Sequence, residues 1–115
     1  MTEKELKERT KAFSHRCLDV LDALPKGMVA GILGKQLGRA ATSVAANYRA
    51  ACRGRSKAEF AAKLGIVEEE ADECGFWLTL IHERGLVPES KLRPLIQEAS
   101  EITAIMVASI RSSRS

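Results

Sequence analysis

The chain has 115 residues, of which 45% are hydrophobic and 29% charged, and its formal net charge is +3. This length supports one hydrophobic core rather than two, and the composition is that of an ordinary globular domain. Only five residues are aromatic (three Phe, one Tyr and one Trp), which argues against a β-sandwich. No apolar run approaches the ~20 residues of a membrane span, and no apolar stretch of a signal peptide follows the charged N-terminus, so we expect no membrane association.

The three cysteines, Cys17, Cys52 and Cys74, are odd in number and form no Cys-x-x-Cys motif. A chain without an export signal is expected in the cytoplasm, where disulfide frameworks are rare. Each cysteine lies among apolar residues with helical spacing. We therefore interpret all three as small buried hydrophobic side chains rather than reactive thiols.

Apolar residues recur at three- and four-residue steps in four segments, which predicts four helices. The predicted helices cover about residues 2–23, 28–53, 57–84 and 89–111. Pro25-Lys26-Gly27 separates the first two, a capping box of Ser56 and Glu59 opens the third, and Gly85 ends it. Because the connections are short, we expect residues 1–115 to form one all-α domain, an antiparallel up-down-up-down four-helix bundle.

Charge is segregated along these helices. Residues 26–57 contain seven basic residues and no acidic one, whereas residues 58–84 contain seven acidic residues and two basic ones. Helices of opposite charge can attract each other within one bundle, and the same basic segment can face a polyanion. Both interpretations stay open at this point.

The basic residues of the second predicted helix share one side, within an arc of about 80° opposite its apolar face. This stripe consists of Lys35, Arg39, Arg49 and Arg53, and is followed at the next turn by Arg55 and Lys57. Each cation can neutralise one phosphate, so the stripe is a candidate nucleic-acid-binding surface. No aromatic residue is interleaved to stack bases, which favours backbone contact over sequence reading. The alternative is a solvated face, or one that pairs with the acidic third helix of another copy.

The third predicted helix carries the clearest periodic signal, an apolar seam that alternates by four and three residues over three heptads. The seam consists of Phe60, Leu64, Val67, Ala71, Cys74, Leu78 and Ile81. A second apolar stripe lies off this seam and consists of Ile66, Phe76, Trp77 and Leu80. Since one bundle needs a single apolar stripe per helix, the second stripe predicts an oligomer interface, with a wide core face as the alternative.

Further polar and small residues are interpreted as structural. We expect the Asn47 amide to bond to a neighbouring helix and fix its register. Gly34 and Gly38, on one stripe of the second helix, predict that another backbone passes close by, because glycine is unfavourable inside helices.

Glu70 and Glu73, one turn apart, have Lys63 on the same side of the third helix. No nucleophile, paired histidine or phosphate loop accompanies these carboxylates. We therefore predict a structural ion pair, within the bundle or between subunits, and no catalytic residue. Neither His15 nor His82 has a glutamate three residues before it, so we predict no di-metal site and no cofactor.

A family resemblance extends from Ala40 to Leu80. The stretch contains Thr-Ser-Val-Ala-Ala-Asn-Tyr-Arg at 42–49, Cys-Arg-Gly-Arg-Ser at 52–56, Glu-Phe at 59–60, Lys-Leu-Gly-Ile-Val at 63–67, Glu-Ala-Asp-Glu at 70–73 and Trp-Leu at 77–78. The fourth segment adds Pro-Glu-Ser at 88–90 and Glu-Ala-Ser-Glu-Ile at 98–102. In combination these motifs resemble the four helix bundle protein family, also called the 23S rRNA intervening-sequence protein family.

The resemblance implies a small bacterial protein, sometimes encoded within insertions in rRNA genes, that forms a four-helix bundle and assembles into a ring-shaped homopentamer. It also implies similarity to accessory proteins of diversity-generating retroelements, which bind a reverse transcriptase and nucleic acid. The family pattern usually has a glutamate three residues after the asparagine. This chain has Ala50 there, so any bond made by that glutamate is missing.

We therefore predict a non-enzymatic, homo-oligomeric scaffold that binds the backbone of RNA or DNA through the basic stripe, with a reverse-transcriptase-like protein as a further candidate partner. The alternative is a protein-interaction module that binds no nucleic acid and whose charges serve subunit assembly.

Overall fold

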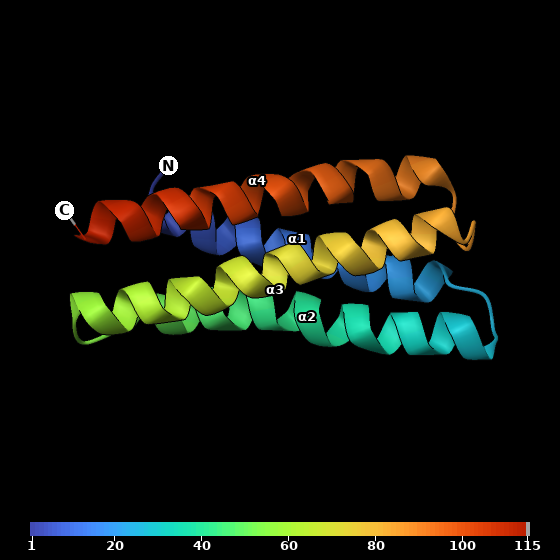
Figure 1. Ribbon diagram of the computed structural model, residues 1–115, viewed down its shortest axis with the longest axis horizontal. Helices are drawn as coiled ribbons and strands as arrows, with labels where there is room; N and C mark the ends of the chain where they lie inside the picture. The colour runs from blue at the N-terminus through green and yellow to red at the C-terminus, as the bar shows by residue number, and fades with distance from the viewer. Residues whose placement is uncertain (115) are drawn as a thin grey trace.

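Residues 1–114, which the computed structural model describes, fold into four long helices (Figure 1). These are α1 (Glu3–Ala23), α2 (Met28–Cys52), α3 (Lys57–Glu83) and α4 (Glu89–Arg114). Consecutive helices run antiparallel, so that both termini and the α2–α3 turn lie at one end of the bundle. No strand occurs within the described residues. The prediction of an all-α fold with four helices is confirmed.

The helix ends follow from local capping. Thr2 Oγ1 accepts from the Glu5 amide and the Glu5 carboxylate accepts from the Thr2 amide, both at 3.1 Å, which is a full capping box. Ser56 Oγ accepts from the Glu59 amide at 3.0 Å, but the Glu59 carboxylate accepts from the amide of Arg55 rather than that of Ser56. The capping box predicted for α3 is therefore only half correct. α4 reaches Arg114, three residues beyond its predicted end.

The core extends along the whole bundle, which measures 46 × 21 × 19 Å. The largest fully buried side chains include Phe13, Leu37, Leu64, Leu78, Ile81, Leu92, Ile102 and Met106. The predicted seam of α3 is buried from Leu64 to Ile81, whereas Phe60 is half-buried. Phe60 lies in the first turn of α3, at the end of the bundle, where fewer neighbours cover it. Within the described residues, no helix combines the length and the hydropathy needed to cross a bilayer.

α1 is the least tightly packed helix, because it contacts α2 moderately and α4 sparsely, whereas α3 packs extensively against both of its neighbours. Polar contacts supplement its packing. Ser14 Oγ donates to the Ala41 carbonyl of α2 at 2.6 Å. Arg9 donates through Nε and Nη2 to both carboxylate oxygens of Glu98 at 2.8 and 2.6 Å, and through Nη2 to Glu101 at 3.0 Å. This bidentate pair is the strong form of an ion pair and joins α1 to α4.

Gly34 and Gly38 face α1, but leucine side chains rather than a backbone lie against them. A Cβ on Gly34 would lie 3.0 Å from Leu24 Cδ1, and a Cβ on Gly38 would lie 3.1 Å from Leu21 Cδ1. The prediction of a close backbone is therefore wrong. The missing side chains instead make room for the two leucines at the C-terminal end of α1.

Candidate functional site

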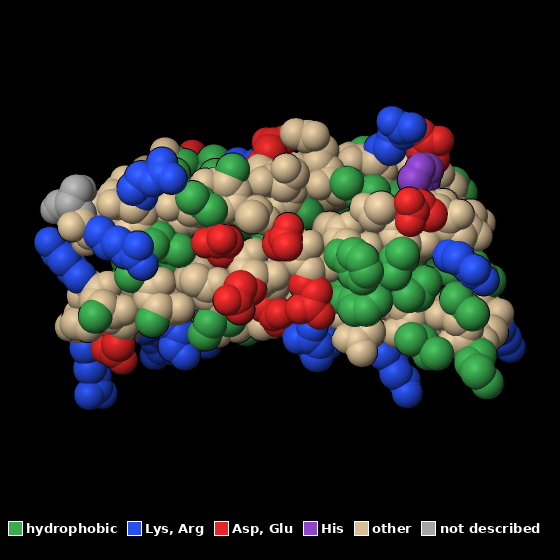
Figure 2. Space-filling view, viewed as in Figure 1, with side chains coloured by type: hydrophobic (Ala, Val, Ile, Leu, Met, Phe, Trp, Pro, Cys, Tyr) green, Lys and Arg blue, Asp and Glu red, His purple; other side chains and the backbone are tan. Residues whose placement is uncertain are grey.

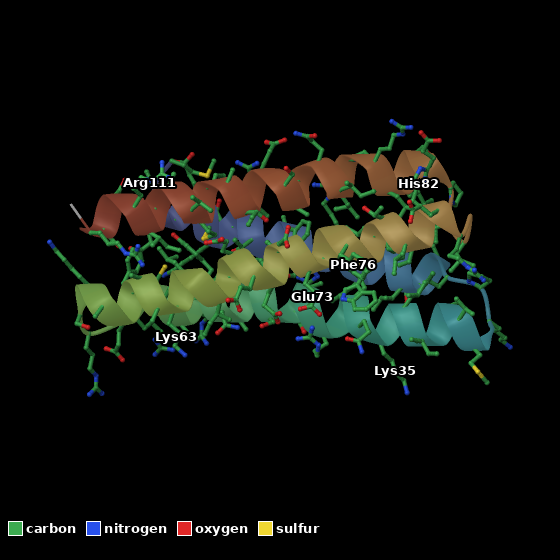
Figure 3. The ribbon with its side chains drawn as sticks, in the orientation of Figure 1. Lys35, Lys63, Glu73, Phe76, His82 and Arg111 are labelled. Atoms are coloured by element: carbon green, nitrogen blue, oxygen red, sulfur yellow. The ribbon has the colours of Figure 1, made fainter. Side chains whose placement is uncertain are left out.

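The six basic residues predicted to form the α2 stripe or to follow it fall into three groups. Lys35 is exposed in the N-terminal half of α2, about 21 Å along the helix axis from Arg49 (Figure 3). Arg39 contacts α3. The remaining four cations are exposed around the α2–α3 turn, and within residues 1–114 none of them makes an ion pair with an acidic side chain. We call these four residues the basic end: Arg49, Arg53, Arg55 and Lys57.

Arg39 lies outside that surface because it bridges α2 and α3. Its Nη1 lies 3.0 Å from Glu70 Oε2, and its Nη2 donates to Glu73. Trp77 Nε1 donates to the same Glu73 carboxylate at 3.1 Å, and this bond, together with the Arg39 guanidinium, lowers the pKa of Glu73. Glu70 and Glu73 thus form ion pairs within the bundle, but with Arg39. Across the described part of the chain, Lys63 has no ion pair.

Asn47 makes its hydrogen bonds within its own helix. It is half-buried, and its Nδ2 donates to the Ser43 carbonyl at 2.9 Å and to Ser43 Oγ at 2.8 Å. The predicted bond to a neighbouring helix is wrong, because a serine one turn earlier offers two acceptors within reach. Ala50, which stands where the family pattern has glutamate, is also half-buried.

A groove between α1 and α2 adjoins the basic end and has a volume of about 550 Å³. It is lined by Lys4, Lys7, Glu8, Lys11, Ala45, Ala46 and Arg49. The three lysines were not predicted as site residues, although their three- and four-residue spacing already places them on one side of a helix. The sequence pattern does not show the contact between α1 and α2 that brings these lysines and Arg49 to one groove.

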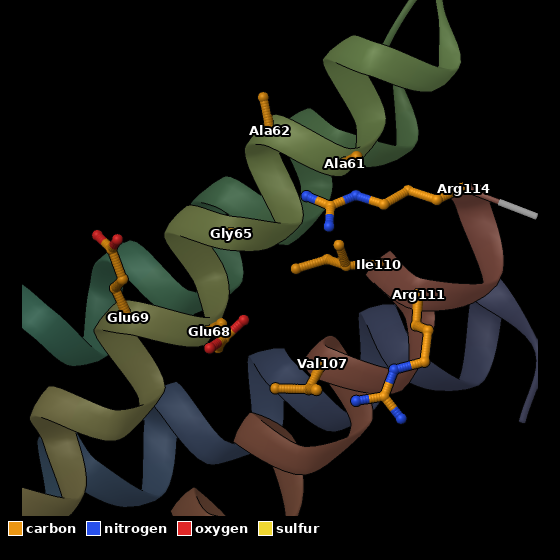
Figure 4. Close-up of a pocket in the computed structure, with 9 residues that line it drawn as sticks. All are labelled: Ala61, Ala62, Gly65, Glu68, Glu69, Val107, Ile110, Arg111 and Arg114. Carbon is orange, nitrogen blue, oxygen red and sulfur yellow. The ribbon is translucent and has the colours of Figure 1, made fainter.

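A second groove, of about 520 Å³, lies between the start of α3 and the end of α4 (Figure 4). Small residues of α3, among them Ala61 and Gly65, form one wall, and the Ile110 side chain of α4 points across the groove toward them. Glu68 and Arg111 both line it, so its charge is mixed and favours no single class of ligand.

An exposed apolar patch covers α3 near its C-terminal end and the N-terminal half of α2 (Figure 2). Phe76 and Ile32 are each 56% exposed, and the Phe76 and Trp77 rings meet edge to face with centroids 5.0 Å apart. We call this set the apolar patch: Met28, Val29 and Ile32 of α2 with Phe76, Trp77 and Leu80 of α3.

The apolar patch differs from the interface stripe predicted on α3. Trp77 and Leu80 are half-buried and pack against the core, as the alternative of a wide core face on α3 predicts. Ile66 is 38% exposed, but it lies about 15 Å along α3 from Phe76, with acidic residues in between. The α2 members were missed because Met28 and Ile32 lie toward the basic side of the helix, whereas Val29 lies at the edge of its core face.

The cysteines lie in protected positions. Cys17 and Cys74 are fully buried, and their mutual hydrogen bond together with burial raises the pKa of Cys74. Cys52 is half-buried, and burial raises the pKa of its thiol. Within residues 1–114, no three His, Cys, Asp or Glu side chains gather in a way that could hold a metal ion.

The fold and these surfaces define the class: an antiparallel four-helix bundle with a basic end and an apolar patch on its side. The chain belongs to the 23S rRNA-intervening sequence protein family, whose model matches residues 3–108. It is similar to a crystal structure of a protein with unknown function from the S23 ribosomal protein family of Bacteroides thetaiotaomicron. The two share 26% identity and a TM-score of 0.87, over 96% of this chain and 99% of the other. No curated protein matches this chain.

The family membership confirms the resemblance seen in the sequence. The four-helix fold expected from that resemblance is also the fold of the Bacteroides protein, as the TM-score requires. Neither the family description nor that structure assigns a reaction.

Proposed function

We propose that this chain is a non-enzymatic scaffold that binds the backbone of RNA or DNA through its basic end. The observation that carries the proposal is the gathering of Arg49, Arg53, Arg55 and Lys57 around one turn, exposed and, in the described part of the chain, paired with no acid. Each cation that neutralises a phosphate releases a counterion, which drives sequence-independent binding. Membership of a family named after a 23S rRNA intervening sequence supports RNA as the ligand.

We also infer that copies of the chain assemble through the apolar patch. Phe76 and Ile32 expose more than half of their surface, and large exposed apolar groups on a small domain favour burial against a partner. A ring-shaped homopentamer in the bacterial cytoplasm is the assembly that the family resemblance implies, and a reverse-transcriptase-like protein is a candidate partner for it. Several basic ends on one assembly would multiply a weak backbone contact.

Binding is tested with fluorescently labelled single-stranded RNA and duplex DNA across a salt series. We expect log K to fall linearly with log salt, and the double variant Arg53→Glu, Arg55→Glu to flatten the slope by about 1.5, because each lost phosphate contact removes about 0.7–0.9. The matched control, Lys26→Glu with Lys91→Glu, changes charge equally at the opposite end and should keep the wild-type slope. Absence of binding at low salt would contradict the proposal.

Assembly is tested by light scattering on Phe76→Glu, which places a charge in the apolar patch without entering the core. We expect the mass to fall toward that of the 12.6 kDa monomer. Ala104→Glu, on the exposed side of α4, is the matched control and should leave the mass unchanged. An unchanged mass for Phe76→Glu would exclude the apolar patch as the interface.

A protein-interaction module is the second candidate, and one observation favours it. Glu69 and Asp72 are exposed on α3 in the stretch that leads to the apolar patch, so the basic end of another copy could pair with them. In that case the wild type binds no RNA or DNA at low salt, while Arg53→Glu with Arg55→Glu lowers the assembled mass.

A further inference from the structure

The groove between α1 and α2 is lined by cations from both helices. α1 contributes Lys4, Lys7 and Lys11, and α2 contributes Arg49. Among residues 1–114, only Lys7 of these four makes an ion pair, an exposed contact to Glu3 at 3.7 Å. An exposed pair of this kind contributes about 0–1 kcal/mol, so Lys7 can exchange it for a phosphate.

The net charge of the groove is positive, because its lining includes four cations and one acid, Glu8. Each of the three lysines is separated from the next by three or four residues, so the series rises about 10.5 Å along α1. In a nucleic-acid helix each strand carries one phosphate per about 3.4 Å of axis, so this length spans about three phosphate-to-phosphate spacings. The lysine series therefore matches a short run of one backbone.

The rest of the groove lining is small and apolar. Ala45 and Ala46 of α2 also line the groove, and their short side chains leave space for a sugar-phosphate chain to approach the bundle. No aromatic residue lines the groove among the described residues, so there is no surface on which a base could stack. Contact there would be with phosphates, which position a strand without reading its sequence.

We propose that this groove is the phosphate-backbone site of the protein, with the α1 lysines on one wall and Arg49 on the other holding a single strand. The inference rests on the nucleic-acid binding proposed above and extends the bound surface from the basic end, through Arg49, into the space between α1 and α2. A concave site with cations on both walls fits a strand, whereas a flat lipid surface would meet only its rim.

The test compares two triple variants with the same charge change in the salt series with labelled single-stranded RNA. Lys4→Gln, Lys7→Gln, Lys11→Gln removes the α1 wall. Its matched control replaces three exposed cations outside the groove and outside the predicted stripe by glutamine: Lys26, Arg84 and Lys91. Losing three phosphate contacts should flatten the slope of log K against log salt by about 2, and the control variant should bind RNA as the wild type does.

The cations on the two helices allow a second measurement, the energetic coupling between Arg49 and the α1 lysines. If one strand touches both, Arg49→Gln should weaken binding strongly in the wild type and only slightly in the α1 triple variant, a coupling that independent surfaces would not show. Circular dichroism of each variant checks that the helices are intact.

Each outcome separates the two proposals. If the wild type binds RNA and the α1 triple variant keeps the wild-type slope, the groove assignment is wrong while nucleic-acid binding stands. If the wild type binds no RNA at low salt, nucleic-acid binding itself fails. Binding to phosphatidylserine vesicles without binding to RNA would overturn the groove assignment in favour of a membrane surface.

Discussion

Replacing Gly65 by alanine should stabilise the bundle. Gly65 lies inside α3, and a Cβ placed on it would meet nothing within 4 Å. Alanine is favoured over glycine in a helix interior by about 0.8–1 kcal/mol. For 115 residues the unfolding entropy is about 0.24 kcal/mol/K, so a gain of about 1 kcal/mol should raise Tm by about 4 °C.

The other helical glycines supply the comparison. A Cβ on Gly75 would lie 3.6 Å from Ala99 Cβ, an ordinary contact, so Gly75→Ala should stabilise about as much as Gly65→Ala. A Cβ on Gly38 would lie 3.1 Å from Leu21 Cδ1, so that leucine must shift and part of the gain is lost. We expect Gly38→Ala to change Tm less than Gly65→Ala, or to lower it.

Thermal and urea unfolding followed by circular dichroism measures this series. All variants must be compared at one protein concentration, because the Tm of an oligomer depends on concentration. The reasoning is refuted if Gly38→Ala stabilises as much as Gly65→Ala, since the contact with Leu21 would then have no effect. A lower Tm for Gly65→Ala would show that something occupies the space beside Gly65 in the assembled protein.

Three further predictions concern single side chains. Arg9→Ala should destabilise the bundle by about 1–3 kcal/mol in urea unfolding, between the values for exposed and buried ion pairs, because it leaves the partly buried Glu98 carboxylate of α4 unpaired; a neutral effect would show that this ion pair does not stabilise the contact between α1 and α4. Leu64→Ala should cost about 2–5 kcal/mol and Phe60→Ala less than Leu64→Ala, because the Phe60 ring is half-buried; equal losses would contradict this assignment of burial. Trp77→Phe removes a donor that lowers the pKa of Glu73. When folding lowers the pKa of a carboxyl group, the ionised group stabilises the fold at pH values above its unfolded pKa. This stability is lost as the pH falls through the folded pKa. Urea midpoints from pH 7 to 3 should therefore fall more steeply below about pH 4.5 in the wild type than in the variant.

The fold was predictable because its signal is local. The heptad spacing from Leu64 to Ile81 is a property of one helix, and the structure buries every residue of it. Phe60 has the same spacing but lies at the end of the bundle, and a periodic pattern does not indicate where the neighbouring helices stop covering it.

The surfaces were less predictable because they depend on pairs of helices. A helical projection places Arg39 on the basic side of α2, but it does not show that this long side chain reaches Glu70 and Glu73 of α3. It also does not show that Lys7 of α1 shares a groove with Arg49, 42 positions later in the sequence. Charge segregation was visible in the sequence, whereas the division of those charges into ion pairs and unpaired cations required the helix contacts.

The sparse packing of α1 has a consequence for binding. The helix that is easiest to detach should open first in native-state hydrogen exchange, before the global unfolding of the core. α1 also carries three of the four groove cations. A strand that contacts cations of both helices therefore binds only when α1 is packed against α2. At a concentration of about 100 times Kd, such a ligand adds about 2.7 kcal/mol to the docked state. Amide protection in α1 would then report occupancy of the groove, and the strand would act as a cross-link between the first helix and the rest of the bundle.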